Sequence, residues 1–366
     1  MSLAAVGFER VPPLDGIRGV ALLLVILGHI SDQLFPGGRI GVDLFFVLSG
    51  FLITSILLGE YRQTGSISVP RFYLRRALRL FPALFSVVLF GVIYAWFTED
   101  PARFDNTITD AKWVVGYIWN WRLVMSGQNV ADHQHMFMHM WSLSVEEQFY
   151  IIWPFLALAL LWLNPPRWAI GGLFAAGILG PEIGRLIFRT DPFSLSMYFN
   201  GALRSDALMW GAGLAWLLHL NVRLPFLAVL GPIAFVGLIW MSHCELLSSG
   251  ALYVWGFSLA ALLSATAIAA VATGQSALLV RSMGLAPLRW VGKISYGLYL
   301  WHVPVWVIVE RLPVAPAWKS VLIVAATFAV STVSFYYYEQ PFLRLKDRIG
   351  HKKPRAEVSS ALGKAA

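Results

Sequence analysis

Charged residues and cysteines are both scarce in this sequence. Only 13% of its 366 residues are charged, whereas 58% are hydrophobic, and the mean hydropathy is +0.66. These values lie far from the globular norm and are typical of a chain that crosses a membrane several times. The single cysteine, Cys244, excludes an internal disulfide and a metal site built from several thiolates. The net charge of +8 would suggest nucleic acid in a soluble protein. Here basic cytoplasmic loops explain it better, and we expect no nucleic-acid partner.

Ten apolar stretches are long enough to cross about 30 Å of hydrocarbon. The stretch 112–127 is shorter and carries Lys112, Asn120 and Arg122, so we interpret it as an interfacial aromatic segment. Asp15 and Arg18 stand at the front of the first apolar run and no small-residue cleavage site follows, so we expect this segment to stay in the mature chain. The predicted spans lie near residues 15–35, 41–59, 78–97, 143–163, 168–188, 203–220, 225–242, 250–273, 292–311 and 319–342.

The distribution of basic residues orients these spans. With both termini in the cytoplasm, 19 of the 28 lysines and arginines fall on the cytoplasmic side, as the positive-inside bias favours. An eleventh span would invert everything after it and place the basic tail outside. We therefore predict an all-α, polytopic bundle of about ten transmembrane helices with cytoplasmic N- and C-termini. The membrane domain is expected over residues 1–345, followed by a basic, disordered cytoplasmic tail over 346–366.

The first apolar stretch, LDGIRGVALLLVILGHI, contains an arginine and a histidine. An ionisable group in a span costs a few kcal/mol or more unless it faces a polar interior. From Arg18 to His29 a helix makes three turns plus roughly 20° and rises about 16 Å, so both residues share one face. Asp15 lies three residues before Arg18 and can pair with it. The alternative is an interfacial ion pair and a packing histidine.

The second and third spans begin with two different polar patterns. GVDLFFVLSGFLIT contains Asp43 and the small pair Ser49-Gly50, and we interpret Ser49 as a packing residue rather than a nucleophile. RFYLRRALRLFP places several arginines at the expected cytoplasmic mouth of the third span. Guanidinium groups suit phosphate oxygens, so this pattern predicts a docking site for a soluble polyanion, with anchoring to lipid phosphates as the alternative. The arginines concerned are Arg75, Arg76 and Arg79.

The segment HMWSLSVEEQFYIIWP runs from the expected outer surface into the fourth span. Glu146 and Glu147 differ by about 100° around a helix, so we expect at most one of them to point fully into a shared cavity. Such a carboxylate can act as an acid or a base, or orient a histidine, unless both are solvated at a capped helix start. Upstream stand His133, His135 and His139, but without a thiolate or a fixed secondary structure we predict no metal site.

Two further segments carry charged or titratable residues inside predicted spans. In ALRSDALMWGAG, Arg204 and Asp206 stand at the outer end of the sixth span, at the depth expected for Glu146 and His29. In GKISYGLYLWHVPV, Lys293 marks the cytoplasmic start of the ninth span, and His302 follows about 14 Å deeper. A histidine in the middle of a span is either a hydrogen-bonded interior group or a participant in chemistry.

Together these segments resemble the acyltransferase-3 family of integral membrane O-acyltransferases. The resemblance covers nearly the whole chain, with six stretches in the same order. The family's arginine and histidine separated by ten residues match Arg18 and His29. Its Arg-x-x-Arg matches Arg76 and Arg79, and its Trp-Ser-Leu-x-x-Glu ends at Glu146. The stretches are LDGIRGVALLLVILGH, GVDLFFVLSGFLIT, RFYLRRALRLFP, WSLSVEEQFY, RSDALMWGA and ISYGLYLWHVPV.

The resemblance implies an acyl-CoA donor, usually acetyl-CoA, as a co-substrate taken from the cytoplasm, with no permanently bound cofactor. The implied acceptor is a hydroxyl of a glycan or of a small molecule such as a macrolide, and the implied location is the bacterial inner membrane. Some relatives carry an additional extracytoplasmic SGNH esterase-like domain. Because the sequence ends at residue 366, we expect transfer to finish within the membrane unit or on a separate protein.

The predicted site follows from these matches. His29 is expected as general base or transient acyl carrier, with Glu146 orienting it and Arg18 stabilising the developing oxyanion. A transporter or flippase of a glycan or lipid-linked intermediate is the alternative. It would not explain why arginines cluster at one mouth while histidine and glutamate gather near the other. The donor is expected on Arg75, Arg76 and Arg79, and substrate contacts from Asp15, Asp43, Ser142, Glu147, Arg204, Asp206 and His302.

Overall fold

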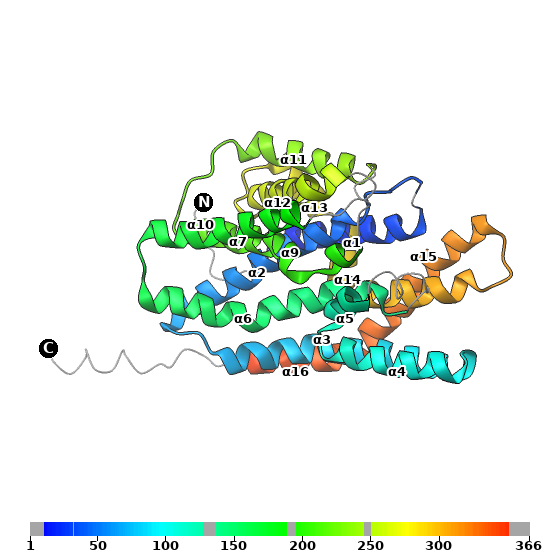
Figure 1. Ribbon diagram of the computed structural model, residues 1–366. Coiled ribbons are helices and arrows are strands. Elements are labelled where there is room, and N and C mark those ends of the chain that lie inside the picture. Colours follow the sequence, from blue (N-terminus) through cyan, green and yellow to red (C-terminus); the bar gives the residue numbers. More distant parts are fainter. Residues whose placement is uncertain (1–10, 32, 127–135, 189–194, 245–249, 351–366) are drawn as a thin grey trace.

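The computed structural model describes residues 11–31, 33–126, 136–188, 195–244 and 250–350. Within these ranges every regular element is a helix, and the long helices lie alongside one another in one bundle (Figure 1). The predicted all-α fold is therefore confirmed.

Seven helices surround the site described below. They are α1 (Pro12–Ile30), α2 (Ile40–Thr64), α3 (Val69–Thr98), α6 (Trp141–Leu163), α10 (Asp206–His219), α14 (Ala286–Glu310) and α16 (Gln340–Gly350). The other helices connect them or pack around them. They are α4 (Pro101–Val115), α5 (Trp119–Ser126), η2 (Met138–Met140), α7 (Arg167–Ile187), α8 (Leu195–Phe199), α9 (Gly201–Arg204), α11 (Leu227–Met241), α12 (Gly250–Ala272), α13 (Ala277–Met283), α15 (Pro316–Val333) and η3 (Ser334–Glu339).

Among the described residues, seven helical segments are long and apolar enough to cross a membrane. Three of the ten predicted spans, 203–220, 225–242 and 292–311, are not among them. They fall on α10 and α11, which have only 14 and 15 residues, and on α14, whose polar residues lower its hydropathy despite its 25 residues. The qualifying segments are Pro12–Ile30, Ile40–Thr64, Val69–Thr98, Met138–Leu163, Arg167–Ile187, Trp255–Ala272 and Trp318–Ile349.

The aromatic stretch 112–127 differs from the interfacial segment that we predicted. Its helix breaks between α4 and α5, where Tyr117 adopts a positive φ of 53°, so neither piece is long enough to span. Trp119 and Asn120 are fully buried. The backbone N–H of Trp119 donates to Ser144 Oγ at 3.2 Å. This stretch therefore packs into the protein, because its polar groups find partners on α6.

The final helix extends past the boundary that we placed at residue 345. α16 runs to Gly350, and the residues beyond it lie outside the described part of the chain. Before it, η3 is a single π-helical turn. A π turn shifts the side chains that follow it, and such turns are frequent at functional sites. Here it contributes Phe335 and Glu339 to the cavity described below.

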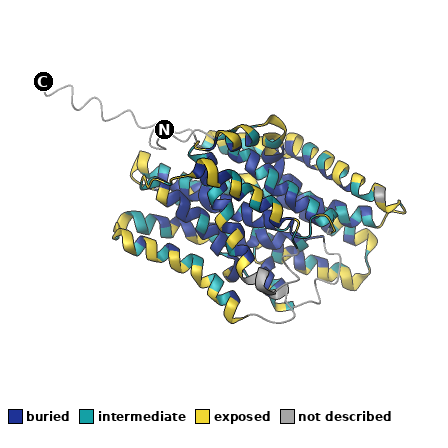
Figure 2. Cartoon of the chain, turned by 90° about the horizontal axis from the view of Figure 1, so that it is seen from above, coloured by how far each residue is buried: buried dark blue, intermediate teal, exposed yellow. Residues whose placement is uncertain are grey.

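Buried residues fill the interior of the bundle and exposed ones face outward (Figure 2). Many of the exposed residues are large and apolar. Trp162 and Trp168 are each 80% exposed and flank the short connection between α6 and α7. Phe97 is 79% exposed at the end of α3. Exposed tryptophans near helix ends are typical of the boundary between lipid and water. The chain is therefore a multi-pass membrane protein.

Glycines let two pairs of helices cross at close range. A Cβ on Gly292 of α14 would lie 1.7 Å from the carbonyl oxygen of Asp15 in α1. A Cβ on Gly211 of α10 would lie 1.9 Å from the carbonyl oxygen of Val47 in α2, and Gly50 approaches α10 in the same way. Small residues at helix crossings are characteristic of membrane proteins. The predicted packing role in the Ser49-Gly50 pair therefore belongs to Gly50.

We expect the Gly211→Ala variant to be less stable than the wild type by about 1–3 kcal/mol, because the added methyl group would push α2 and α10 apart. Thermal unfolding in detergent measures the change. Gly180→Ala on α7 is the matched control, since its Cβ would meet no atom within 4 Å. Equal unfolding temperatures for the two variants would show that the close crossing contributes nothing to stability.

Candidate active site

A cavity of about 780 Å³ opens at the end of the bundle where α1 and α3 begin and where α2 and α10 end. α6, α14, η3 and α16 complete its walls. Its lining contains more basic than acidic residues. The basic ones are Arg18, Arg62, Arg75, Arg76, Arg79, Lys293, Arg344 and Lys346, and the acidic ones are Asp15, Glu146, Glu147, Glu339 and Asp347.

Two arginines of the lining are held by carboxylates. Arg18 pairs with Asp15 at 3.1 Å, as the sequence predicts. Arg76 pairs with Glu147, and its guanidinium carbon lies 3.5 Å from the centre of the Tyr150 ring. Arg76 is thus fixed from both sides. Its charge is largely balanced before any ligand arrives.

Glu146 accepts hydrogen bonds from two hydroxyl groups, Ser49 Oγ and Tyr150 Oη. Both Glu146 and Glu147 line the cavity. They project from α6 in different directions. Glu146 is directed to α2 and Glu147 to α3, and the cavity reaches the two carboxylates between these helices.

The sequence predicted that the arginines lie at one mouth of the protein and the glutamates near the other. This separation is wrong. Arg76 and Glu147 touch, and Arg79 and Glu146 line the same cavity. The prediction placed the start of α6 at the outer surface. In the structure the residues just before α6 are inside the protein, since His139 and Met140 are 4% and 1% exposed. The start of α6 is therefore inside the protein and not at its surface, and the glutamates one to two turns further along the helix lie beside the arginines.

Three further cations, on α3 and α14, face the cavity without an ion pair to any described carboxylate. Arg75 and Arg79 are accessible on α3, and Lys293 is accessible on α14. Lys293 lies 5.4 Å from the ring centre of Phe335 and 5.5 Å from that of Tyr336. Aromatic faces stabilise a cation without neutralising it. These three groups give the cavity a positive charge that a polyanion can balance.

Ser142 and Tyr299 line the cavity next to a group of histidines. Tyr299 Oη donates to the carbonyl oxygen of His139 at 2.8 Å and accepts from Ser142 Oγ at 2.6 Å. The Tyr299 ring centre lies 5.3 Å from the ring centres of both His139 and His302. Neither histidine lines the cavity. Tyr299 therefore stands between the cavity and the histidine rings.

The histidines form a cluster from three separate segments. The ring centres of His29 and His302 are 5.1 Å apart and those of His139 and His302 are 4.8 Å apart, both pairs edge-to-face. Pro304 contributes to this arrangement. It has no N–H, so the carbonyl oxygen of Leu300, four residues earlier, loses its helical donor. His139 Nε2 donates to that oxygen at 3.1 Å instead.

Backbone carbonyls define which nitrogen of each histidine carries a proton, because a carbonyl oxygen only accepts. His29 Nδ1 donates to Val25 O at 2.8 Å, and His302 Nδ1 donates to Tyr299 O at 2.5 Å. In the neutral form both rings then carry the lone pair on Nε2. This is the tautomer that a general base needs, and it is imposed on His29 by its own helix.

The predicted partnership of Glu146 with His29 does not match these positions. Glu146 lines the cavity, and His29 does not. The ring that meets His29 edge-on belongs to His302. Arg18 lines the cavity and His29 lies beyond it. These positions agree with one continuous α1 from Pro12 to Ile30.

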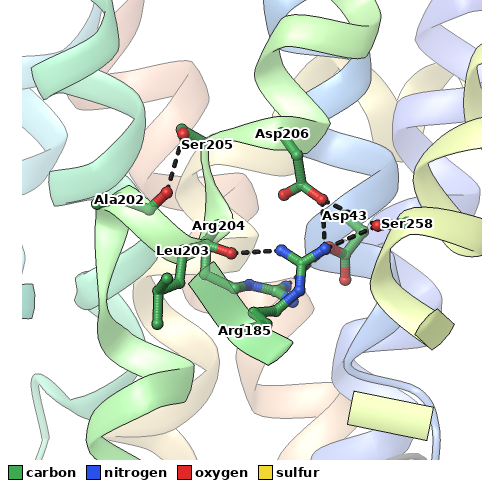
Figure 3. A network of polar contacts seen from close by, with 8 residues as sticks. All are labelled: Asp43, Arg185, Ala202, Leu203, Arg204, Ser205, Asp206 and Ser258. Atoms are coloured by element: carbon green, nitrogen blue, oxygen red, sulfur yellow. Dashed lines mark hydrogen bonds and ion pairs between the residues drawn. The ribbon is translucent and has the colours of Figure 1, made fainter. Parts of the chain in front are cut away.

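Asp43, Arg204 and Asp206 do not line the cavity, although they were predicted to contact substrate. Arg204 pairs with Asp43 at 2.7 Å, and Asp206 pairs at 2.7 Å with Arg185 of α7 (Figure 3). Ser258 of α12 accepts from Arg185 at 2.7 Å. All four charged side chains are at most 2% exposed. They join α2, α7, α9, α10 and α12 in the interior, away from the lining of the cavity.

Within the described residues, no group of three or more histidine, cysteine, aspartate or glutamate side chains is placed so that it could hold a metal ion. His139 belongs to the histidine cluster, and His133 and His135 lie outside the described residues.

Several residues of the site were not selected from the sequence. Tyr150 was detectable, because it stands one helical turn after Glu146, and Tyr299 stands three residues before His302. Ser49 was interpreted as packing, yet it donates to Glu146. Lys293 was noted only as a topological marker. Arg185 carried no local signal, because its partner Asp206 lies on a different helix.

The fold and the cavity define a multi-pass membrane protein with a cationic, partly apolar pocket that opens at one end of the bundle. Sequence comparison defines it further. The profile of the acyltransferase domain family matches residues 12–337, and the chain belongs to this family. Comparison with solved structures finds no match.

Two curated relatives illustrate the family. The peptidoglycan O-acetyltransferase OatA of Listeria monocytogenes is 33% identical over 350 residues, which cover 91% of this chain and 56% of the relative. The O-acetyltransferase OatA of Staphylococcus aureus is 29% identical over 351 residues, which cover 90% of this chain and 57% of the relative. The chain thus spans a little over half the length of these relatives.

Proposed function

We propose that this protein is a membrane-embedded O-acyltransferase that moves an acyl group, most simply acetyl, from acyl-CoA to a hydroxyl of a carbohydrate or glycosylated acceptor. The observation that carries the proposal is the cavity, with cations that lack an ion pair on its walls, hydroxyl groups at its far side and imidazole rings behind Tyr299. Membership of the acyltransferase family and O-acetyltransferase relatives support it. They favour it over the transporter or flippase that the sequence left as an alternative.

The cavity opens toward the cytoplasm in this proposal. Ten spans with cytoplasmic termini place the arginine-rich start of α3 at the inner surface, and the positive-inside bias supports that orientation. α10, α11 and α14 then cross the membrane within the bundle although they are short or polar, because neighbouring helices cover them. In a bacterium this orientation corresponds to the inner membrane, where cytoplasmic acyl-CoA is available.

The donor's phosphates bind the accessible cations Arg75, Arg79 and Lys293. Arg76, held by Glu147 and stacked on Tyr150, positions this part of α3. The apolar side chains of the lining accommodate the pantetheine arm, which directs the thioester toward Ser142 and Tyr299. Rotation of Tyr299, with loss of its two hydrogen bonds, opens the way from the cavity to His302 and His29.

His29 then acts as the general base. Its Nε2 accepts the proton of the acceptor hydroxyl, and the hydroxyl oxygen attacks the thioester carbonyl carbon. The carbon–sulfur bond breaks, the CoA thiolate takes up the proton, and the products are the acyl ester and free CoA. The alternative route has two steps. Nε2 first attacks the thioester carbonyl carbon, the carbon–sulfur bond breaks and the CoA thiolate leaves. The acceptor hydroxyl then attacks the acyl-imidazole, so that the acyl group passes to the hydroxyl oxygen, the imidazole is released and the hydroxyl proton ends on the CoA thiolate. Arg18 lies on the same helix face about 16 Å before His29, too far to contact a thioester held at His29, and is proposed to contact the donor where it enters the cavity instead.

We expect Arg79→Gln to weaken acetyl-CoA binding by at least about tenfold, since one charge-assisted contact to phosphate contributes about 1.5–3 kcal/mol. Calorimetric titration of the purified protein with acetyl-CoA measures the affinity. Arg103→Gln is the matched control, because Arg103 is 63% exposed on α4 and outside the cavity. A wild-type protein that does not bind acetyl-CoA would refute the proposed donor, and unchanged binding by Arg79→Gln would refute its proposed position.

A further inference from the structure

The last described helix adds basic residues to the mouth of the cavity. α16 lies alongside the start of α3 (Figure 1). Its residues Gln340, Leu343 and Asp347 form one stripe along the cavity, as their three- and four-residue spacing requires. Arg344 and Lys346 border this stripe and also line the cavity, whereas Arg348 of the same helix does not.

These cations are brought together with little negative charge to balance them. Lys346 is repelled by both Arg75 and Arg79 of α3. Its own carboxylate partner, Asp347, lies 3.3 Å away but has a side chain that is 69% exposed, so the pair contributes little. The hydrogen-bond partner of Arg344 is the neutral Gln340, at 3.3 Å. Like charges that converge on a cavity form a site for an anion.

The site lies at the outer part of the cavity, away from Ser142 and Tyr299. If the thioester of the donor reaches toward Tyr299, the nucleotide end of the donor remains near the mouth. That end carries two separate phosphate groups, the diphosphate next to the pantetheine arm and the monoester on the 3′-oxygen of the ribose. Arg79 lies one helical turn further along α3 from the mouth than Arg75, and together with Lys293 of α14 it suits the diphosphate. α16 is then left beside the outermost phosphate, a dianion that needs more than one cation.

We propose that Arg344 and Lys346 of α16, together with Arg75, form a binding site for the 3′-phosphate of the donor's ribose. The proposal rests on acyl-CoA being the donor. It makes α16 a specificity element, because a thioester of pantetheine or of 3′-dephospho-CoA lacks the group that these residues bind. Acyl carriers without a 3′-phosphate are then poor donors even when their thioester is identical.

The test compares acetyl-CoA with acetyl-3′-dephospho-CoA in binding titrations of the full chain in detergent. The wild type is expected to bind acetyl-CoA at least about tenfold more tightly than the dephospho form. In the double variant Arg344→Gln/Lys346→Met this preference falls to less than about threefold, because only acetyl-CoA binding weakens. Arg348→Gln, on the same helix but outside the cavity, retains the full preference.

The outcomes separate this inference from the proposed donor. If the wild type binds neither ligand, acyl-CoA is not the donor and both proposals fail. If it binds both equally, or if the double variant loses affinity for both equally, the donor stands and the 3′-phosphate site is wrong. A repeat with added anionic phospholipid tests the other source of phosphate. Loss of the preference in its presence would assign the α16 cations to lipid headgroups instead.

Discussion

Replacing His29 by alanine is expected to lower acyl transfer by about a hundredfold to ten-thousandfold, the range that a general base contributes. Binding of acetyl-CoA is expected to remain at the wild-type level, because His29 does not line the cavity. The measurement combines turnover of labelled acetyl-CoA, with a panel of hydroxyl acceptors, and a donor titration on the same preparation. The split between lost turnover and retained binding places the chemistry at His29 rather than at the donor site.

His243→Ala provides the matched control. His243 is an exposed histidine whose ring contacts Phe35, 4.7 Å between centres, and it belongs to neither the cavity nor the histidine cluster. Its removal is expected to leave turnover unchanged. Full activity in His29→Ala would mean that the base is a different group, even if acetyl-CoA still binds. Trapping of a labelled acyl group on the wild type, but not on His29→Ala, would favour the two-step route.

The spacing of Arg18 and His29 predicted their relation correctly, because it depends only on helix geometry. Both residues lie on a single uninterrupted α1, and the Asp15–Arg18 pair forms as the three-residue spacing indicates. The same local logic identified the close approach at Gly50 and the cluster of arginines at the start of α3. Predictions that involve one helix were reliable for this reason.

Predictions that depended on the depth of one helix relative to another were less reliable. Glu146 was assigned to His29 by counting residues from a presumed membrane surface. The segment before α6 is buried inside the protein, so α6 does not start at that surface and the position counted for Glu146 is wrong. The role of Pro304, which frees Leu300 O for His139, requires two distant segments to meet and leaves no local pattern. Arg185 is a similar case, because only the fold brings it to Asp206.

The second large effect is expected from Arg204→Met, which leaves Asp43 buried without its partner. Removing one member of a buried ion pair costs about 3–5 kcal/mol, because a charge remains in a dry interior. We expect a large fall in the unfolding temperature in detergent and a smaller folded fraction on size-exclusion chromatography. Arg103→Met is the control, since its pair with Asp100 is exposed on both sides and is worth at most about 1 kcal/mol.

The double variant Asp43→Leu/Arg204→Met then separates structure from function. Removing both charges eliminates the unpaired group, so stability is expected to recover most of the loss. If Asp43 and Arg204 serve only to hold α2 against α9 and α10, the double variant recovers turnover together with stability. If instead they contact substrate, as their sequence context predicted, it folds and binds acetyl-CoA but remains inactive. Because neither residue lines the cavity, we expect both stability and turnover to recover. A double variant that folds but is inactive would show instead that Asp43 and Arg204 contact substrate.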